Sequence, residues 1–203
     1  MNKLTTLFLT ATLTAASAIA APASKTPAGN RTLIVYFSRT GENYSVGTVK
    51  EGNTAILAKM IAEQTKGTLF EVKPAKQYPA DYKTTCDLAK KELNDGARPA
   101  ILGDVRDFAA YDTVFIGYPV WWGDLPMAMY TFIEKHNFAG KVVIPFNTHE
   151  GSEQGSSISG LTKACKGAKL LKGIAIPGHT AQNDRAGARA SITEWLKGIG
   201  IAK

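Results

Sequence analysis

Two short polar segments follow the first strongly apolar stretch of the chain. Residues 38–41 (Ser-Arg-Thr-Gly) come directly after the apolar stretch 32–37, and residues 52–54 (Gly-Asn-Thr) precede a run with helical spacing. The first N–H groups of a helix have no internal partner and carry the positive end of the helix dipole, so such a loop suits a phosphate group. The alternative interpretation is that Asn53 or Thr54 only caps the helix.

A second distinctive segment spans residues 119–126 (Pro-Val-Trp-Trp-Gly-Asp-Leu-Pro). Adjacent residues point in different directions, so at least one of Trp121 and Trp122 is expected to face outward. An exposed Trp next to Gly123 is a suitable platform for a flat ring, because aromatic stacking adds about 0.5 to 1.5 kcal/mol beyond the burial of area. The pair therefore favours ligand stacking, and packing of one ring in the core is the alternative.

The third polar segment, residues 147–156, is rich in glycine and precedes a helix. Such a segment offers many backbone N–H donors. His149 beside Glu150 suggests acid-base or metal chemistry, but no second His or Cys lies at ligand spacing, so no metal site is expected. The same two residues are the only candidates for a general base in these loops.

Five segments are predicted as strands, and they alternate with five predicted helices. The strands are expected at 32–37, 69–72, 113–118, 141–146 and 169–176, and the helices at about 54–66, 81–93, 127–136, after 156, and 186–196. This alternation favours an α/β fold with parallel strands and right-handed crossovers. Ligands of such sheets bind at the carboxyl edge, where the three polar segments are expected to meet. A phosphorylated flat ring fits this set of loops.

The two helices that flank the second strand show further signals. The first helix is expected to end at Gly67, where a left-handed residue is wanted. In the second helix, one amphipathic stripe is formed by Tyr82, Cys86, Ala89 and Leu93.

The strand at 69–72 alternates as an edge strand does. Residues 42–51 are too polar for the core, so they are interpreted as an insertion folded over the site. Within it, Tyr44 either covers a ligand or faces solvent.

The composition is that of one globular domain, with 203 residues of which 44% are hydrophobic and 20% charged. The 24 Lys and Arg exceed the 17 Asp and Glu, which gives a formal net charge of +7. The basic residues are scattered and form no run that resembles a nucleic-acid-binding arm. The charge is therefore interpreted as a bias toward acidic partners or surfaces, and no nucleic-acid partner is expected.

The N-terminal residues 1–20 have the features of a signal peptide. Lys3 provides a short positive start, residues 4–16 are apolar, and Ala18-Ile19-Ala20 is a small-x-small site. Cleavage is expected after Ala20, so the mature protein is expected in the periplasm or secreted. No membrane anchor is expected, because the apolar stretch is short and diluted by Thr. Residues 21–30 are interpreted as a flexible leader, which leaves 31–203 as the folded domain.

The two cysteines, Cys86 and Cys165, are too few for a disulfide framework, although an oxidising compartment would permit one bridge. Their predicted helices follow the second and fourth strands with a third helix between them, which disfavours pairing without excluding it. A catalytic thiol is also disfavoured, since neither cysteine has a His nearby in the sequence.

The three polar segments together resemble the motifs of the flavodoxin-like family. The resemblance rests on Tyr-Phe-Ser-Arg-Thr-Gly at 36–41 with its split continuation at 52–54, Gly-Tyr-Pro-Val-Trp-Trp-Gly at 117–123, and Thr-His-Glu-Gly-Ser at 148–152. It covers about residues 32–196 and is closest to a subgroup with an interrupted phosphate loop. It implies a flavodoxin-like doubly wound sandwich with a five-stranded parallel sheet of order 2-1-3-4-5 and helices on both faces. Flavodoxins are themselves an example of ligand binding at the carboxyl edge.

The resemblance also implies a noncovalently bound FMN. The phosphate is expected near Ser38, Arg39, Thr40, Asn53 and Thr54. The isoalloxazine ring is expected to be flanked by Pro119, Val120, Trp121, Trp122 and Gly123. The other ring edge is expected near Thr148, His149, Gly151, Ser152 and Gly155. FMN would carry the redox chemistry itself, so no catalytic residue is expected, and donors from His149 and the amides near Gly151 would tune its potential.

The chain departs from the familiar electron carriers of the family, which are acidic and cytoplasmic, because it is basic and has a predicted export signal. A soluble pyridine nucleotide is not expected outside the cytoplasm. Electron transfer to or from a redox partner protein or a quinone-like molecule is therefore favoured. The alternatives are an FMN-dependent NAD(P)H:quinone or nitro-compound oxidoreductase and a non-catalytic flavin-binding module.

Overall fold

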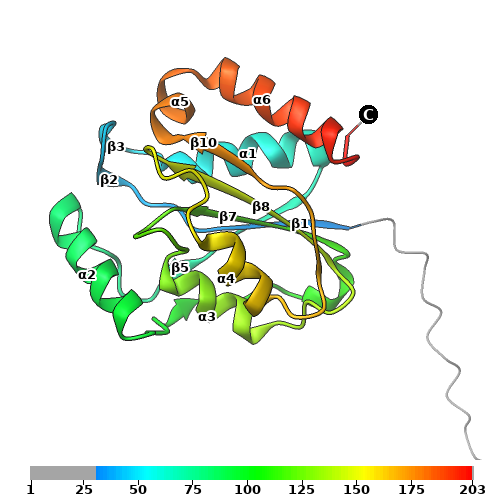
Figure 1. Ribbon diagram of the computed structural model, residues 1–203, viewed down its shortest axis with the longest axis horizontal. Helices are drawn as coiled ribbons and strands as arrows, with labels where there is room; N and C mark the ends of the chain where they lie inside the picture. The colour runs from blue at the N-terminus through cyan, green and yellow to red at the C-terminus, as the bar shows by residue number, and fades with distance from the viewer. Residues whose placement is uncertain (1–30, 203) are drawn as a thin grey trace, which may run out of the picture.

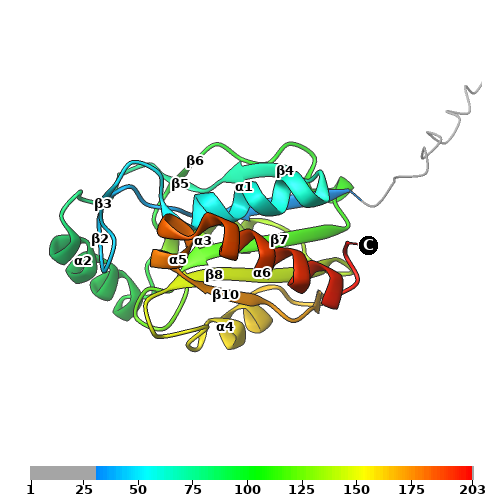
Figure 2. The same cartoon turned by 90° about the horizontal axis from the view of Figure 1, so that it is seen from above.

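The computed structural model describes residues 31–202, so the predicted signal peptide at 1–20 and leader at 21–30 lie outside the described residues. Its centre is a parallel sheet in the order β10-β8-β7-β1-β4 (Figures 1 and 2). These strands are β1 (Thr32–Tyr36), β4 (Thr68–Glu71), β7 (Thr113–Pro119), β8 (Val142–His149) and β10 (Ile174–Pro177). Counted along the chain the order is 2-1-3-4-5, so the predicted parallel sheet is confirmed.

The central strands are buried on both faces, as their β-branched and aromatic residues predict. In β1, Leu33 and Val35 pack into one hydrophobic cluster, whereas Ile34 between them packs into the other. This alternation follows from the period of two in a strand. At the sheet edge, β4 exposes 39% of Leu69, in agreement with the predicted edge strand.

The fifth predicted strand, 169–176, is divided into β9 (Lys169–Leu170) and β10, and both pair with β8. Between the two paired stretches, the three residues 171–173 lie opposite only two residues of β8, Ile144 and Pro145. One extra residue on one strand is the feature that defines a β-bulge. Pro145 has no N–H to give to the ladder. In addition, a Cβ on Gly173 would lie 2.6 Å from the Pro145 oxygen, so the backbones approach closely at the break.

Helices cover both faces of the sheet (Figure 1). One face carries α1 (Asn53–Thr65), α5 (Gly178–Asn183) and α6 (Arg185–Gly198). The other side carries α2 (Tyr82–Asn94), α3 (Met127–Lys135) and α4 (Ser157–Ala164). The short α5 and a 3-10 turn, η1 (Phe108–Ala110), were not predicted from the sequence.

The end of α1 differs from the expectation in one residue. The left-handed residue is Lys66, with φ of 57°, and not Gly67. Gly67 is required for a different reason, because a Cβ there would lie 2.4 Å from Cδ1 of Ile34. The glycine thus permits close packing of the helix end on β1.

Two small antiparallel sheets accompany the main one. The predicted insertion forms the hairpin of β2 (Gly41–Asn43) and β3 (Gly47–Val49), which lies beside α2 (Figures 1 and 2). The second sheet pairs β5 (Lys73–Pro74) with β6 (Ile101–Leu102). Both cysteines are free thiols, with Cys165 buried and Cys86 partly buried. Between residues 31 and 202, none of the helices combines the length and apolarity needed to cross a membrane.

Candidate functional site

A cavity of about 460 Å³ opens at the carboxyl edge of the sheet. Each of the three predicted loops contributes to its lining, and so do the β2–β3 hairpin and α2. The predicted site residues that line it are Arg39, Asn53, Pro119, Val120, Trp121, Trp122, Gly123, Thr148, His149 and Ser152. The remaining ones, Ser38, Thr40, Thr54, Gly151 and Gly155, are not part of the lining. The structure therefore brings the three loops together at one place.

One end of the cavity is formed by the first turn of α1. Ser38 Oγ accepts a hydrogen bond from the N–H of Ala55 at 3.0 Å, and the N–H of Ile56 donates to the Gly52 carbonyl at 3.3 Å. Within residues 31–202, the N–H groups of Asn53 and Thr54 have no acceptor. Two donors at a helix N-terminus are thus left for an anion.

The side chain of Thr54 itself is buried and does not reach the cavity. Its hydroxyl lies 2.9 Å from the hydroxyl of Thr148 on β8, which joins the start of α1 to the neighbouring strand. The side chain of Asn53 accepts a hydrogen bond from Gln182 on α5 at 2.8 Å. Neither residue is the helix cap, because Gly52 occupies that position.

Arg39 holds the hairpin against the start of α2. Its Nη2 donates to the carbonyls of Pro79 and Ala80, each at 2.7 Å, and Nη1 donates to the carbonyl of Glu42. Its Nε atom is buried and has no acceptor among the described residues. Burial lowers the pKa of this guanidinium from its ordinary value, although the neighbouring acidic groups oppose the shift. Arg39 therefore places a cation in the lining of the cavity, while its unpaired Nε is enclosed by the protein.

The two tryptophans lie in a tight turn after β7. Trp121 and Asp124 exchange both backbone hydrogen bonds at 2.9 and 3.0 Å, and Trp122 and Gly123 between them have φ of 52° and 83°. Positive φ at both central residues defines a type I′ turn. A bulky residue such as Trp122 rarely adopts this conformation, so the neighbours must hold it in place.

The indole rings of this turn face different ways, as expected for adjacent residues. Trp121 packs edge-on against Phe37 and Tyr78, with ring centroids 5.2 and 4.9 Å away. Trp122 is 52% exposed, its Nε1–H donates to the Cys86 carbonyl at 2.9 Å, and Lys90 Nζ lies 4.5 Å from its ring centroid. Trp121 is thus anchored in the core, and Trp122 bridges the turn to α2.

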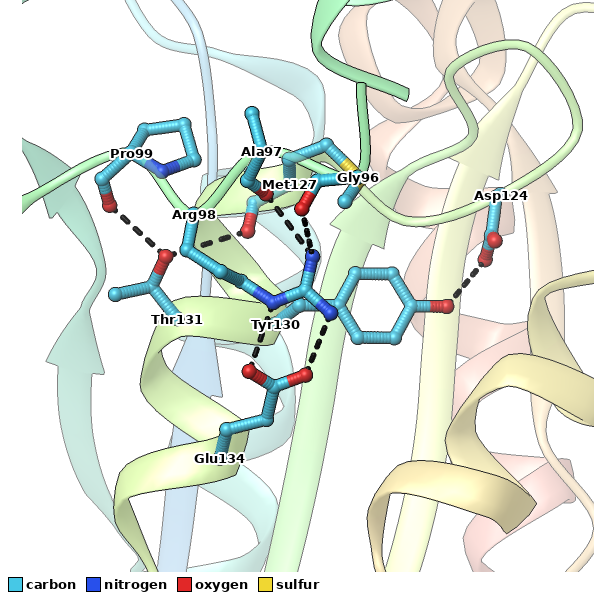
Figure 3. Close-up of polar contacts among 9 residues, drawn as sticks. All are labelled: Gly96, Ala97, Arg98, Pro99, Asp124, Met127, Tyr130, Thr131 and Glu134. Carbon is cyan, nitrogen blue, oxygen red and sulfur yellow. Dashed lines mark hydrogen bonds and ion pairs between the residues drawn. The ribbon is translucent and has the colours of Figure 1, made fainter. Parts of the chain in front are cut away.

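Contacts from two further segments fix this turn. The Gly123 carbonyl accepts hydrogen bonds from the N–H and the Oγ of Ser156, at 2.7 and 2.9 Å. Asp124 Oδ1 accepts one from the hydroxyl of Tyr130 on α3 at 2.9 Å (Figure 3). Gly155 is also needed here, since its Cβ would lie 2.4 Å from the Gly123 oxygen.

His149 is the last residue of β8, so Asn147, Thr148 and His149 belong to a strand and not to the predicted loop. Its Nδ1 accepts hydrogen bonds from the N–H groups of Gly151 and Glu153, at 3.0 and 3.1 Å. A nitrogen that accepts carries no proton, so the proton of the neutral ring lies on Nε2. Burial lowers the pKa of His149, against the opposing effect of nearby carboxylates. The imidazole is therefore neutral and can donate a hydrogen bond from Nε2. The Gly151 N–H already donates to Nδ1 of this ring, so it points toward His149.

Glu150, which also lines the cavity, is bound to the start of α5. Its carboxylate accepts a hydrogen bond from the N–H of His179 at 2.8 Å and lies 2.7 Å from Nδ1 of the same residue. A carboxylate held in this way is poorly placed to act as a general base. No group of three or more potential metal ligands is found in the part of the chain that the structure describes.

The wall formed by α2 was not predicted. Tyr82, Thr85, Cys86 and Ala89 line the cavity. The sequence showed Tyr82, Cys86 and Ala89 on one amphipathic stripe, but such a stripe ordinarily faces the core. Here Tyr82 remains 37% exposed. No feature of the sequence alone distinguishes a stripe that faces a cavity from one that faces the core.

Comparison with known proteins agrees with this site and fold. The family model of flavodoxin matches residues 31–197. A protein from Bacteroides eggerthii DSM 20697 that is assigned as a flavoprotein is 32% identical with a TM-score of 0.66, over 84% of this chain and 98% of that one. Another from Bacteroides uniformis ATCC 8492 is 34% identical with a TM-score of 0.65, over 81% and 99%.

A third solved structure is a flavoprotein from Lactobacillus acidophilus NCFM in complex with FMN. It is 24% identical with a TM-score of 0.58, over 78% of this chain and 99% of that one, and at this identity it supports the fold alone. No match is found among curated proteins. Since the family model covers most of the chain and the fold agrees, this protein belongs to the flavodoxin family.

Proposed function

We propose that this protein binds FMN noncovalently and exchanges electrons with a protein or quinone-like partner outside the cytoplasm. One observation carries the proposal: Asn53, whose N–H at the start of α1 is unused, and the Trp121–Trp122 turn line the same cavity. A ligand that carries both a phosphate group and a flat ring requires N–H donors at one end of its site and aromatic side chains at the other. The FMN complex of the Lactobacillus flavoprotein supports the choice of cofactor.

The residues present fit FMN in size and in donor chemistry. The cavity of about 460 Å³ is in the range of sites for molecules of this size. The N–H groups of Asn53 and Thr54 have no acceptor among the described residues, and Arg39 adds a positive charge to the cavity lining, as a phosphate requires. We assign the phosphate to residues 38–40 and 53–54, the ring to 119–123, and the other ring edge to 148–155.

Bound FMN would supply the redox chemistry, because its ring accepts and releases electrons. The chain binds and orients it: Trp121 is fixed by the core, and Trp122 is fixed by α2. His149 carries its proton on Nε2 and is the group we assign to donate a hydrogen bond to the ring edge. Such a donor stabilises negative charge on the reduced ring and raises the midpoint potential.

The absorption spectrum of the freshly purified mature protein tests the proposal. Reconstitution with FMN at micromolar concentration should give a yellow protein that is reversibly reduced by dithionite. Adding NADH or NADPH under anaerobic conditions should reduce it slowly or not at all; rapid reduction would favour the nicotinamide-dependent reductase instead. A protein that binds FMN but transfers no electrons to any acceptor would be a flavin-binding module. A protein that does not bind FMN would refute the proposal.

Export is part of the proposal and rests on residues 1–20, which lie outside the described residues. Expression of the full chain should yield a protein in the extracytoplasmic fraction. Its measured mass should be that of the chain from Ala21 to Lys203. A cytoplasmic protein that retains residues 1–20 would contradict it. Removal of residues 1–20 takes away one positive charge, Lys3, so the formal net charge falls from +7 to +6, and this excess makes an acidic partner the expected one.

A further inference from the structure

The short helix α5 contacts the phosphate end of the cavity at two places. Gln182 Nε2 donates to Oδ1 of Asn53 at 2.8 Å, and a Cβ at Gly178 would lie 2.1 Å from Nδ2 of the same Asn53. Gly178 and Gln182 are four residues apart, so they lie on one face of the helix. The side-chain amide of Asn53, a residue that lines the cavity, is therefore packed against α5.

The contacts of Gln182 decide which end of the Asn53 amide it binds. Gln182 Nε2 also donates to the backbone carbonyl of Glu51 at 2.7 Å. A carbonyl oxygen only accepts, so the group that Gln182 presents there is its NH2. The same NH2 lies against Asn53 and requires an acceptor, which is the oxygen Oδ1. The backbone carbonyl of Glu51 thus fixes the orientation of both side-chain amides.

The nitrogen Nδ2 is the part of the Asn53 amide that a ligand can use. Within residues 31–202 it has no acceptor. Unlike the Nε of Arg39, it is not an enclosed atom. Since Asn53 lines the cavity, a phosphate bound there can accept a hydrogen bond from Nδ2.

Gln182 is itself held in place from both sides. Helix α5 packs against α1 and α6 (Figures 1 and 2). The Glu51 carboxylate is bound to Arg185 of α6 at 3.0 Å, so the Glu51 carbonyl is a fixed acceptor. At the start of α5, the Glu150 carboxylate accepts a hydrogen bond from the N–H of His179 at 2.8 Å. Helix α5 therefore connects the segment before α1 with the segment after β8, and Gln182 has little freedom to move.

We propose that Gln182 is a positioning residue of the phosphate end of the site. Through Asn53 it holds a side-chain NH2 as a further donor beside the unused N–H groups of residues 53 and 54. A hydrogen bond to a charged phosphate is stronger than one between neutral groups, so this donor favours FMN over riboflavin, which lacks the phosphate. The inference rests on the proposed function and adds a residue outside the cavity lining that contributes to the choice between the two flavins.

Binding of FMN and riboflavin to the FMN-free protein tests the inference, with quenching of flavin fluorescence as the readout. Gln182→Met nearly keeps the length of the side chain but donates no hydrogen bond. The Kd for FMN should rise by at least about fivefold, which corresponds to about 1 kcal/mol, whereas the Kd for riboflavin should change by less than about twofold. Asn183→Met, at the next and exposed position of α5, is the matched control and should change neither Kd.

A double-mutant cycle with Asn53→Ala separates positioning from a general effect on the fold. Asn53→Ala should raise the Kd for FMN by about tenfold, equivalent to about 1.4 kcal/mol. Adding Gln182→Met to this variant should change the Kd for FMN by less than about twofold, because Gln182 acts through Asn53. Gln182→Lys offers a donor again, so it should bind FMN more tightly than Gln182→Met does. This recovery should be larger with Asn53 present than in the Asn53→Ala variant, where only the added charge acts.

Inorganic phosphate provides a readout that does not depend on a flavin. Phosphate should shift the NMR signals of the Asn53 side-chain NH2 in the FMN-free protein, and the shift should be smaller in Gln182→Met. An equal rise in the Kd for FMN and riboflavin, or a cycle in which the two effects add, would overturn the inference and leave FMN as the cofactor. A protein that binds neither flavin would refute the proposed function. Equal phosphate shifts in Gln182→Met and wild type would overturn the role of Gln182 in either case.

Discussion

The hydroxyl of Tyr130 donates to Asp124 Oδ1 at 2.9 Å, and this bond connects helix α3 to the turn that presents Trp122 (Figure 3). Gly160 on α4 makes room for it, because a Cβ there would lie 2.1 Å from the Tyr130 hydroxyl. Burial and the nearby Asp124 raise the pKa of Tyr130, so its hydroxyl remains a donor at any ordinary pH. The left-handed backbone of Trp122 is therefore supported from outside the cavity.

Removal of this hydroxyl should affect both stability and cofactor binding. Tyr130→Phe leaves Asp124 Oδ1 with one backbone donor, that of Leu125. We expect the free energy of unfolding to fall by about 1 to 2 kcal/mol. The FMN Kd should rise roughly fivefold, equivalent to about 1 kcal/mol, because the turn is less well positioned. Urea unfolding and flavin fluorescence titration measure the two effects.

Glu134→Gln is the control for this variant. It breaks the ion pair between Arg98 and Glu134, whose atoms are 2.6 Å apart in the same cluster, but it leaves Asp124 untouched (Figure 3). Because both partners are partly exposed, the loss should be at most about 1 kcal/mol. Its FMN affinity should equal that of the wild type. Equal FMN affinities for Tyr130→Phe and wild type would contradict the positioning role.

Gly52 is predicted to be the most sensitive glycine of the phosphate end. A Cβ at this position would lie 2.2 Å from Ser38 Oγ and 2.5 Å from the Arg39 oxygen. Gly52→Ala should displace Ser38 from the Ala55 amide and cost at least about 1 kcal/mol of stability, the usual value of a lost helix cap. FMN affinity should fall as well, since the same turn presents the free amides of α1.

Gly198 provides the matched glycine. It lies in α6, and nothing approaches its Cβ position within 4 Å. Gly198→Ala should leave FMN binding unchanged and raise the free energy of unfolding by up to about 1 kcal/mol, because alanine is the better helix former. Thermal unfolding of the two variants with and without FMN compares them. A Gly52→Ala protein as stable as Gly198→Ala would argue against the close approach.

Local patterns were sufficient to predict where most strands of the sheet lie in the sequence. In β7, the apolar residues Val114, Phe115 and Ile116 between polar segments indicate a buried strand, and the structure agrees. The order of the strands came from the family resemblance and not from periodicity. The convergence of the three loops follows from a general rule for parallel sheets, so it could be predicted without knowledge of any side-chain contact.

Features that depend on contacts between distant residues could not be predicted. The break between β9 and β10 depends on Pro145 in the neighbouring strand. The left-handed residue at the end of α1 is Lys66, because Gly67 is needed for packing on Ile34. The exposure of the Tyr82 stripe depends on where α2 lies. In each case the deciding partner is remote in the sequence, and local propensity does not contain it.

The two thiols should differ in reactivity toward iodoacetamide. Burial raises the pKa of the Cys165 thiol to about 12, so its thiolate is scarce in the folded protein. Cys86 is partly buried and lines the cavity. Mass spectrometry should find Cys86 alkylated first in the FMN-free protein and protected when FMN is bound, whereas Cys165 should react only on unfolding. Alkylation of Cys165 before Cys86 would contradict the assigned environments.

His149 should make the free energy of unfolding depend on pH, because its ring holds the loop that follows β8. Its Nδ1 accepts from the amides of Gly151 and Glu153, and protonation of that nitrogen would remove both hydrogen bonds. Burial lowers its pKa from the ordinary 6.5, and the carboxylates of Glu150 and Glu153 oppose this only in part. The unfolded chain therefore takes up the proton at a higher pH than the folded protein.

This difference fixes the direction of the pH dependence. The contribution of His149 to stability is fully present above about pH 6.5, and it decreases as the pH falls through that value toward the lower pKa of the folded state. His149→Gln should therefore lose less stability than the wild type between about pH 7.5 and about pH 5.5, as measured by urea unfolding at both values. FMN binding by the wild type should weaken over the same interval, because the protonated ring no longer holds the loop. Equal losses of stability in both proteins would contradict the assigned tautomer.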